Sequence, residues 1–323
     1  MTARALLLVS ASLAIVAALP APAAADGLPG TGVVPAPVSA PGGDVEYVTR
    51  RAKRDTVLRE RRLDGGPALR RLELRGRYSV PAVAYDGSPS GLSADGRTLV
   101  LINPRKTWPR EQTTFAVVDA RRMKLRRHLR LSGDFSFDAI SPDGRVIYLI
   151  EYLSPRDQTA YAVRAYDMRA RRLFPDPVVD PDEPDEDMSG VPLSRVSDRE
   201  GRWAYTLYSG PEHPFVHALD TERRTAACID LDVRNLRGAG LEIHGGRLDV
   251  VGDSGLLARI DTATHRVIAA PRKRPAPAKR EARASAGAPW LPIAAPSAAL
   301  ILLAGAGWQR ARTRSRSRRV VGT

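Results

Sequence analysis

The chain has 323 residues with a single cysteine, so it can bury a substantial core but cannot form an intramolecular disulfide or a multi-cysteine metal cage. Its formal net charge of +14 is concentrated at the end, since residues 271–323 carry +11 and residues 26–270 only +2. Only five of the 50 basic residues are lysine, which indicates a GC-rich coding bias. We therefore expect no nucleic-acid partner.

The first 25 residues have the layout of a secretory signal peptide. Arg4 precedes an apolar stretch over residues 5–19, and Ala23-Ala24-Ala25 provides a small-residue cleavage site. The apolar part is short for a membrane span, so cleavage is favoured over anchoring. Residues 26–43, which are rich in Gly, Pro, Val and Ala, are expected to form a flexible leader ahead of a domain that covers residues 44–270.

Residues 44–270 contain repeats that are marked by a tight turn before an apolar run. The turn glycines lie 48, 57 and 45 residues apart, at Gly96, Gly144, Gly201 and Gly246. Asp-Gly between β-rich runs is a strong hairpin signal, because such turns need a positive φ that Gly adopts without strain. The following runs are continuously apolar, as in Val146–Ile150, which favours strands covered on both faces.

A second marker keeps step with the first. Each repeat has an apolar stretch that ends in an aspartate able to cap a short polar turn, at Asp119, Asp167, Asp220 and Asp261. Each unit of 40–50 residues thus holds four short strands, which is typical of propeller blades. Residues 45–76 look like a partial unit. The sequence predicts an all-β fold, a β-propeller of about five four-stranded blades, with another two-layered all-β fold as the alternative.

Ser141-Pro142-Asp143-Gly144-Arg145, followed by Val146-Ile147-Tyr148, resembles the repeat of TolB-like propellers and the related YVTN-type surface propellers. The resemblance covers about residues 80–270 and weakens in the last two repeats, which lack the Ser and Pro. It implies a propeller fold. It implies no catalytic residues, because these repeats are structural and their families bind many things.

The insert 175–190 concentrates acidic side chains and lengthens the third repeat. Hard cations prefer several carboxylate oxygens, so the metal-site candidates are Asp180, Asp182, Glu183, Asp185, Glu186 and Asp187. The spacing fits no EF-hand, and a protruding, solvated acidic loop is the simpler interpretation.

Other chemistry-bearing residues favour structural roles. His213 and His217 are four apart, but Pro214 and the strand pattern argue against a helical metal pair, so an edge-loop or packed pair is expected. Cys228 lies among apolar residues and is expected to be a small buried side chain. Trp203, Tyr205 and Tyr208 could face a central channel, although aromatic residues in such strands usually belong to the core.

The C-terminal region has the features of a membrane anchor. Residues 271–288 form a Pro/Ala/Arg-rich stalk, residues 289–308 an apolar transmembrane helix with Trp290 and Trp308 near its ends, and residues 309–323 a basic cytoplasmic tail. A buried hairpin of the domain is the alternative for the apolar segment. With the leader, these segments predict a single-pass cell-membrane protein whose propeller is extracytoplasmic.

The function that the sequence favours is non-enzymatic binding or scaffolding in the cell envelope, with an unknown protein or envelope component as partner. No nucleophile elbow, P-loop, dinucleotide fingerprint or zinc-protease motif occurs, and no cofactor is expected. The alternative is a propeller-scaffold hydrolase, active on lactones or glycans, with its site at the channel mouth. A third possibility is a signalling element whose Arg-rich tail contacts anionic lipid.

Overall fold

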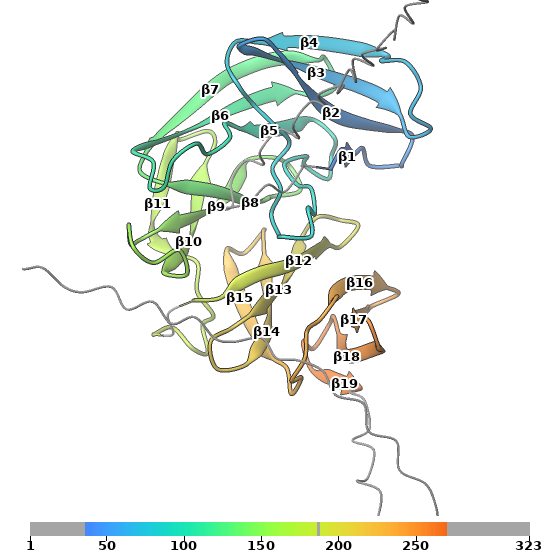
Figure 1. Ribbon diagram of the computed structural model, residues 1–323, viewed down its shortest axis with the longest axis vertical. Helices are drawn as coiled ribbons and strands as arrows, with labels where there is room; N and C mark the ends of the chain where they lie inside the picture. The colour runs from blue at the N-terminus through green and yellow to red at the C-terminus, as the bar shows by residue number, and fades with distance from the viewer. Residues whose placement is uncertain (1–35, 186–187, 270–323) are drawn as a thin grey trace, which may run out of the picture. The chain divides into compact units, whose positions relative to one another are not determined.

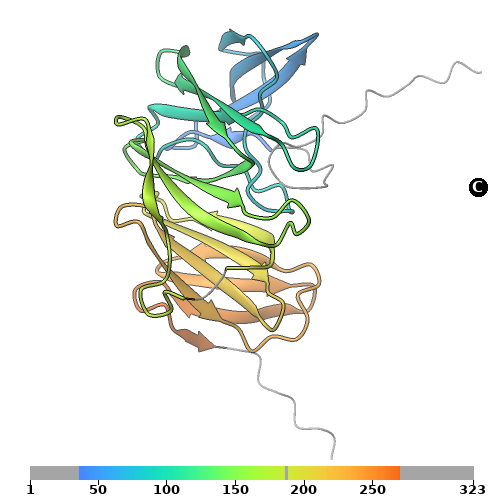
Figure 2. The ribbon, with the colours of Figure 1, turned by 90° about the vertical axis from the view of Figure 1, so that its left-hand side faces the viewer.

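A computed structural model describes residues 36–185 and 188–269, which form 19 strands and no α-helix. The strands make five small antiparallel sheets that succeed one another in chain order (Figure 1). Figure 2 shows the same succession from blue to orange along its vertical direction. The expected signal peptide (1–25), stalk (271–288), transmembrane helix (289–308) and tail (309–323) lie outside the described residues. Within the described ranges, no helix has the length and hydropathy needed to cross a bilayer.

Each sheet is a simple up-and-down meander in which neighbouring strands are consecutive in the chain. Sheet 1 consists of β1 Val38–Ser39, β2 Val45–Ala52, β3 Asp55–Arg62 and β4 Arg70–Leu74. Sheet 2 consists of β5 Thr98–Ile102, β6 Gln112–Asp119 and β7 Lys124–Ser132. Sheet 3 consists of β8 Phe135–Ile140, β9 Val146–Tyr152, β10 Tyr161–Asp167 and β11 Arg172–Pro177.

Sheets 4 and 5 complete the series. Sheet 4 consists of β12 Val191–Ser197, β13 Trp203–Ser209, β14 Pro214–Asp220 and β15 Thr225–Asp230. Sheet 5 consists of β16 Gly240–His244, β17 Arg247–Gly252, β18 Gly255–Asp261 and β19 Val267–Ala269. The strand β1 falls within the segment 26–43, where the sequence predicted only a leader, because a two-residue strand leaves no readable pattern.

The expectation of four strands in every unit is wrong for sheet 2, which has three. Its first position is taken by an irregular segment, residues 79–92, whose backbone pairs with β5 at the isolated bridges Ser79↔Ile102 and Leu92↔Leu99. Between these bridges the chain makes an excursion with its own bridge, Ala82↔Pro89. Prolines at positions 81 and 89 lack the N–H of a strand ladder, which accounts for the departure from a regular strand.

The continuously apolar runs arise because alternate residues of one strand pack against opposite neighbours. In β5, Leu99 and Leu101 belong to the core between sheets 1 and 2, whereas Val100 and Ile102 belong to the core between sheets 2 and 3. Two further cores join sheets 3 and 4 and sheets 4 and 5. No such core joins sheet 5 to sheet 1 within residues 36–185 and 188–269.

The two predicted turn markers are confirmed in detail. The Ser141 hydroxyl accepts hydrogen bonds from the backbone N–H groups of Arg145 and Val146, at 3.1 and 3.0 Å, and donates to Asp143. In the third unit, where the serine is absent, the Asp198 carboxylate accepts the corresponding bond from Trp203 N. The second-marker aspartates also accept bonds from the N–H groups of their own turns, as Asp167 does from Ala170 N at 2.7 Å.

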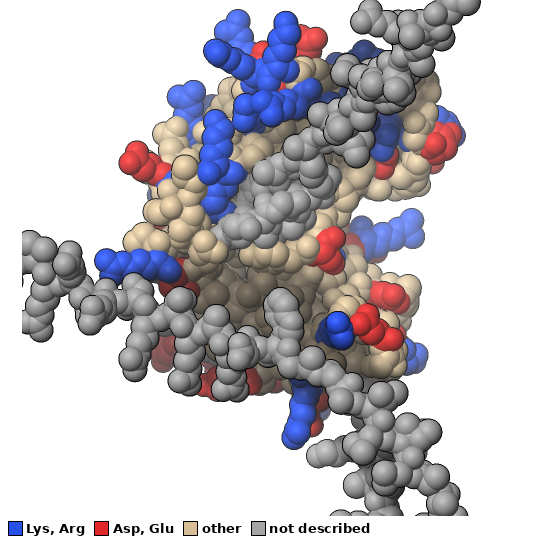
Figure 3. Space-filling view, viewed as in Figure 1, with Lys and Arg blue, Asp and Glu red and all other residues tan. Residues whose placement is uncertain are grey.

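Charge is divided between the sheets rather than spread evenly. Residues 44–132, which include sheet 2 and most of sheet 1, have 21 basic and 10 acidic side chains. Residues 133–270, which contain sheets 3 to 5, have 16 basic and 24 acidic side chains. Figure 3 shows basic side chains gathered over the region of β4 and β7, where Arg71, Arg126 and Arg130 are exposed. The small net charge of residues 26–270 therefore results from a basic first part and an acidic second part whose charges nearly cancel.

Candidate functional site

The excursion 79–92 reaches β12, the first strand of sheet 4, and β12 also contacts β16, the first strand of sheet 5. The backbone N–H groups of Tyr85 and Asp86 donate to the carbonyls of Pro192 and Leu193 in β12, at 2.9 and 3.2 Å. Sheet 2 is thereby tied directly to sheet 4. The inner side of the sheets, where a channel mouth was expected to hold the ligand, is thus crossed by the protein's own backbone.

Carboxylates near the first strands are tied to arginines. Asp138 of β8 pairs with Arg195 of β12, and both side chains are at most 4% exposed. Arg195 Nε also donates to Thr206 Oγ1 at 2.6 Å. Asp134 pairs in the same way with Arg105 and Arg110, and burial lowers the pKa of Arg110 to about 10. These pairs fasten neighbouring segments together.

The three aromatic candidates are divided between the core and a small cavity. Tyr205 is fully buried within the core of sheets 4 and 5, and Trp203 packs edge-on against His265 with ring centroids 4.5 Å apart. Tyr208 faces the other way, into a cavity of about 90 Å³ that it shares with Asp138, Tyr152 and Tyr161. Burial raises the pKa of both Tyr205 and Tyr208 above the ordinary value.

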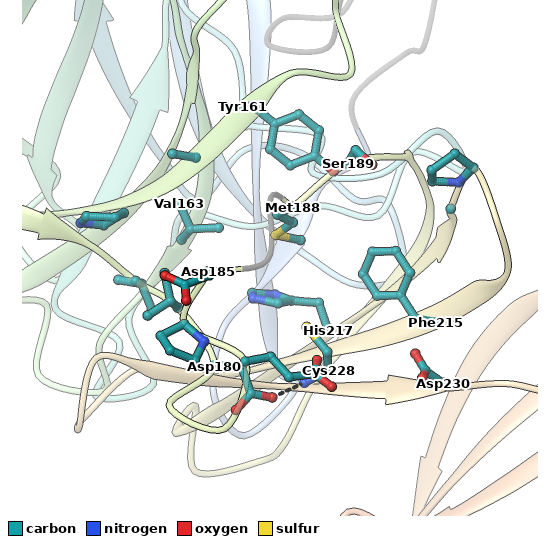
Figure 4. A pocket seen from close by; sticks show the side chains of 18 of the residues that line it. Tyr161, Val163, Asp180, Asp185, Met188, Ser189, Phe215, His217, Cys228 and Asp230 are labelled. Carbon is teal, nitrogen blue, oxygen red and sulfur yellow. Dashed lines mark hydrogen bonds between the residues drawn. The ribbon is translucent and has the colours of Figure 1, made fainter.

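A larger cavity, of about 510 Å³, opens where sheets 3 and 4 meet on the side of β10, β14 and β15 (Figure 4). Its apolar lining includes Tyr161, Val163 and Phe215. Five acidic residues line it, namely Asp180, Glu183, Asp185, Glu212 and Asp230, and no Lys or Arg is among its described lining residues. We refer to it as the acidic pocket.

The acidic insert forms one wall of this pocket instead of only protruding into solvent. Val178 is buried, and its N–H donates to Val163 O of β10 at 2.8 Å. Val179 O accepts from Ala226 N of β15 at 3.1 Å, and Asp180 Oδ2 accepts from Cys228 N at 2.8 Å. The start of the insert is therefore hydrogen-bonded to sheet 3 and to sheet 4. The acidic composition alone did not indicate this attachment.

The predicted metal candidates have different positions. Asp180, Glu183 and Asp185 line the pocket, whereas Asp182 is exposed and its N–H donates to Asp180 Oδ1 at 2.9 Å. Glu186 and Asp187 lie outside the described residues.

Two residues to which the sequence assigned structural roles also line the pocket. His217 on β14 is 3% exposed, and burial lowers its pKa to about 4, with a further lowering by Arg195 against the opposing charges of Asp138 and Asp180. Cys228 on β15 is half-buried and lies directly opposite His217 in the strand register. The imidazole at position 217 is therefore neutral over the physiological pH range. The residues next to Cys228 in the sequence are apolar and did not indicate that Cys228 lies opposite His217.

His213 lies in the turn before β14, and its environment differs from that of His217. It is exposed, and its Nε2 is 2.7 Å from Asp230 Oδ1 at the pocket rim. The expected edge-loop role is thus confirmed for His213, whereas His217 is buried within the pocket.

No family model matches the sequence, and no curated protein matches it. The structure is similar to a putative TolB from Agrobacterium tumefaciens, with 14% identity, a TM-score of 0.42 and coverage of 71% of this chain and 70% of that one. It is also similar to TolB from Acinetobacter baumannii (12% identity, TM-score 0.43, 70% of this chain, 51% of that one). A functionally unknown protein from Desulfotomaculum acetoxidans gives 14% identity, a TM-score of 0.46 and coverage of 72% and 67%.

The chain therefore spans about half of one of these proteins and about two thirds of the others, at distant similarity. The assignment of the fold rests on the sheets themselves. Small meander sheets pack face to face in chain order, each sharing a core with the next, which is how propeller blades are arranged. The described residues form a β-propeller domain. The propeller architecture predicted by the repeats is thus confirmed at this level.

Proposed function

We propose that the protein is a non-enzymatic binding protein of the cell envelope, anchored in the membrane through residues 289–308 with its propeller extracytoplasmic. Its acidic pocket would receive a cationic group of a protein or other envelope component. The observation that carries this proposal is the lining of the pocket, which combines five carboxylates with apolar side chains and in which no described lining residue is Lys or Arg. Such a concave, mixed surface is the usual form of a ligand site.

The carboxylates of the first strands favour binding over hydrolysis. A glycosidase needs two carboxyl groups that exchange protons with substrate or water. Asp134 and Asp138 are instead buried and held by Arg105, Arg110 and Arg195. Their arrangement joins the sheets and gives no support to the hydrolase alternative.

A binding assay with a defined cation tests the pocket. The probe is a fluorescently labelled tetralysine peptide, and its anisotropy is followed as the purified full chain is titrated in at low salt. We expect Glu183→Gln/Asp185→Asn/Glu212→Gln to weaken binding at least tenfold, because three of the five lining charges are removed. The matched control, Asp64→Asn/Glu73→Gln, removes exposed acidic side chains of sheet 1 and its connecting turn and should leave binding unchanged. Equal weakening in both variants would contradict a role for the pocket.

The location is tested separately in cells that express the chain with an internal tag in the propeller. We expect the tagged chain in the membrane fraction, sensitive to protease added outside the membrane, and we expect mass spectrometry to find residues 1–25 removed. Deletion of residues 289–308 should release the protein from the membrane. Recovery of an uncleaved chain from the cytosol would refute the envelope location while leaving the pocket assay intact.

A further inference from the structure

Another cavity of about 510 Å³ lies between sheets 2 and 3, where the tight turns of these two sheets meet. Its walls come from the segment that leads into β5, from β6 and β7, and from the turns that follow β8 and β10. Two of its lining residues are acidic, Asp95 and Asp143, and six are arginines, so the lining has a net charge of +4. The arginines are Arg97, Arg126, Arg127, Arg145, Arg169 and Arg171. We refer to this cavity as the arginine groove.

The repeat itself gathers these arginines. An arginine directly follows the turn glycine in each of the two repeats, as Arg97 and Arg145. The two turns are joined, because Asp95 N–H donates to Pro142 O at 3.0 Å. The turn after β10 lies at the same end of sheet 3 and adds its own arginines to the cavity. The packing of one blade on the next therefore brings cationic side chains from three turns around one hollow.

Two of the arginines form no ion pair. Arg169 and Arg171 are exposed, and neither has a carboxylate within 4.0 Å in the described part of the chain. Arg145 pairs with Asp143 at 3.3 Å, but both side chains are more than half exposed, and such pairs contribute little in water. Six guanidinium groups around one concavity repel one another. An anion held between them relieves this repulsion.

We propose that the arginine groove binds a small ligand through two or more phosphate groups, which belong either to a soluble molecule or to a phospholipid headgroup. The planar guanidinium fork donates two parallel N–H bonds to phosphate oxygens. A phosphate monoester carries more charge than a carboxylate and offers three acceptor oxygens, so two such groups match the net charge of the lining. The volume of the groove is in the range of small-molecule sites.

The arginine groove is separate from the acidic pocket. Strand β10 begins at Tyr161, which lines the acidic pocket, and ends at Asp167, next to Met168 of the groove. Seven residues of extended strand span about 20 Å. Two cavities of opposite charge thus lie at opposite ends of one blade. The phosphate site goes beyond the proposed cation-binding role and does not depend on it.

Calorimetric titration of the purified full chain with sodium tripolyphosphate at low salt tests the groove. We expect Arg169→Gln/Arg171→Gln to weaken binding about tenfold or more, because two charged donors are removed. The matched control, Arg234→Gln/Arg237→Gln, removes the same charge from exposed positions between β15 and β16, outside the groove, and should bind like the unmodified chain. Circular dichroism of each variant establishes that it is folded. Tetralysine binding should be unchanged in Arg169→Gln/Arg171→Gln, which keeps this test independent of the acidic pocket.

Hydrogen–deuterium exchange locates the bound anion, since residues 271–323 are also basic. We expect tripolyphosphate to protect residues 95–98, 143–146 and 168–171. The same protection by vesicles that contain cardiolipin, but not by vesicles of phosphatidylcholine alone, would identify a lipid headgroup as the source. Protection by tripolyphosphate and not by cardiolipin vesicles would identify a soluble ligand. Both results support the phosphate site.

Three results would overturn the phosphate site. The first is the absence of protection at the three turns when tripolyphosphate binds. The second is equal weakening of binding in the two arginine variants. The third is binding of citrate, or of a single-stranded oligothymidine of twelve nucleotides, that is tighter than binding of tripolyphosphate, because this would indicate a carboxylate or a nucleic-acid site instead.

Discussion

Replacing Gly144 by alanine tests whether the repeated turn holds neighbouring sheets together. Gly144 has φ of +69°, and a Cβ at this position would lie 2.5 Å from Thr98 Oγ1 and 2.7 Å from Thr98 Cβ. Thr98 opens β5 of sheet 2 and is 3% exposed, so it has little room to withdraw. The turn that precedes β9 of sheet 3 therefore packs directly against the Thr98 side chain of sheet 2, at a distance that leaves room only for glycine at position 144.

The expected loss of unfolding free energy in Gly144→Ala has two parts. The left-handed backbone costs a non-glycine residue about 1 kcal/mol, and crowding a packed interface costs about 1–3 kcal/mol more. Gly65→Ala is the matched control, because Gly65 has φ of +80° but no atom within 4 Å of the place that an alanine Cβ would occupy. We expect a loss of unfolding free energy of about 1 kcal/mol for Gly65→Ala and about 2–4 kcal/mol for Gly144→Ala.

Urea unfolding followed by circular dichroism measures both variants, and their difference isolates the contact with Thr98. For a domain of this size, a difference of about 2 kcal/mol corresponds to about 4–8 °C in Tm. Equal losses in the two variants would refute the reasoning, since they would mean that the turn glycine is needed only for its backbone conformation.

Three further predictions follow from buried groups. Arg195→Met should cost about 3–5 kcal/mol, because Asp138 is left charged and buried, whereas adding Asp138→Asn should recover much of the loss in a double-mutant cycle by urea unfolding. The free energy of unfolding should fall by about 3 kcal/mol as the pH drops from about 6.5 to about 4, because over this range His217 binds a proton in the unfolded chain but not in the folded one, and His217→Gln should lack this component of the slope. Ser141→Ala should cost about 1–2 kcal/mol, measured as the shift of the urea midpoint, because Val146 N–H loses its acceptor, whereas Arg145 N–H keeps its bond to Asp143 Oδ1.

The repeats were readable because they depend on local rules. The turn around Gly144 needs a positive φ and a short side chain that satisfies its N–H groups, and both requirements appear in the residues themselves. The apolar run of β9 indicated a strand covered on both faces, which the packing of sheets 2, 3 and 4 supplies. The prediction went wrong for residues 79–92, since the excursion is stabilised by bonds to distant β12.

The candidate site was less predictable, because its parts are far apart in the chain. The acidic insert was visible, but its attachment to β10 and β15 depends on backbone bonds that have no sequence signature. Cys228 and His217 carried the patterns of ordinary strand residues. Their partnership depends on the register of β14 with β15, and a shift of one residue would have turned one of them away from the pocket.

The sequence by itself determined the all-β class, the period of the repeats and the chemistry of each turn, because these depend on residues within a few positions of one another. Only the tertiary structure decided which side chains share a cavity. The pairing of Asp138 with Arg195 and the meeting of His217, Cys228 and Asp180 join residues from different strands or sheets. Such contacts are fixed by sheet packing and strand register, which no local stretch of the chain encodes.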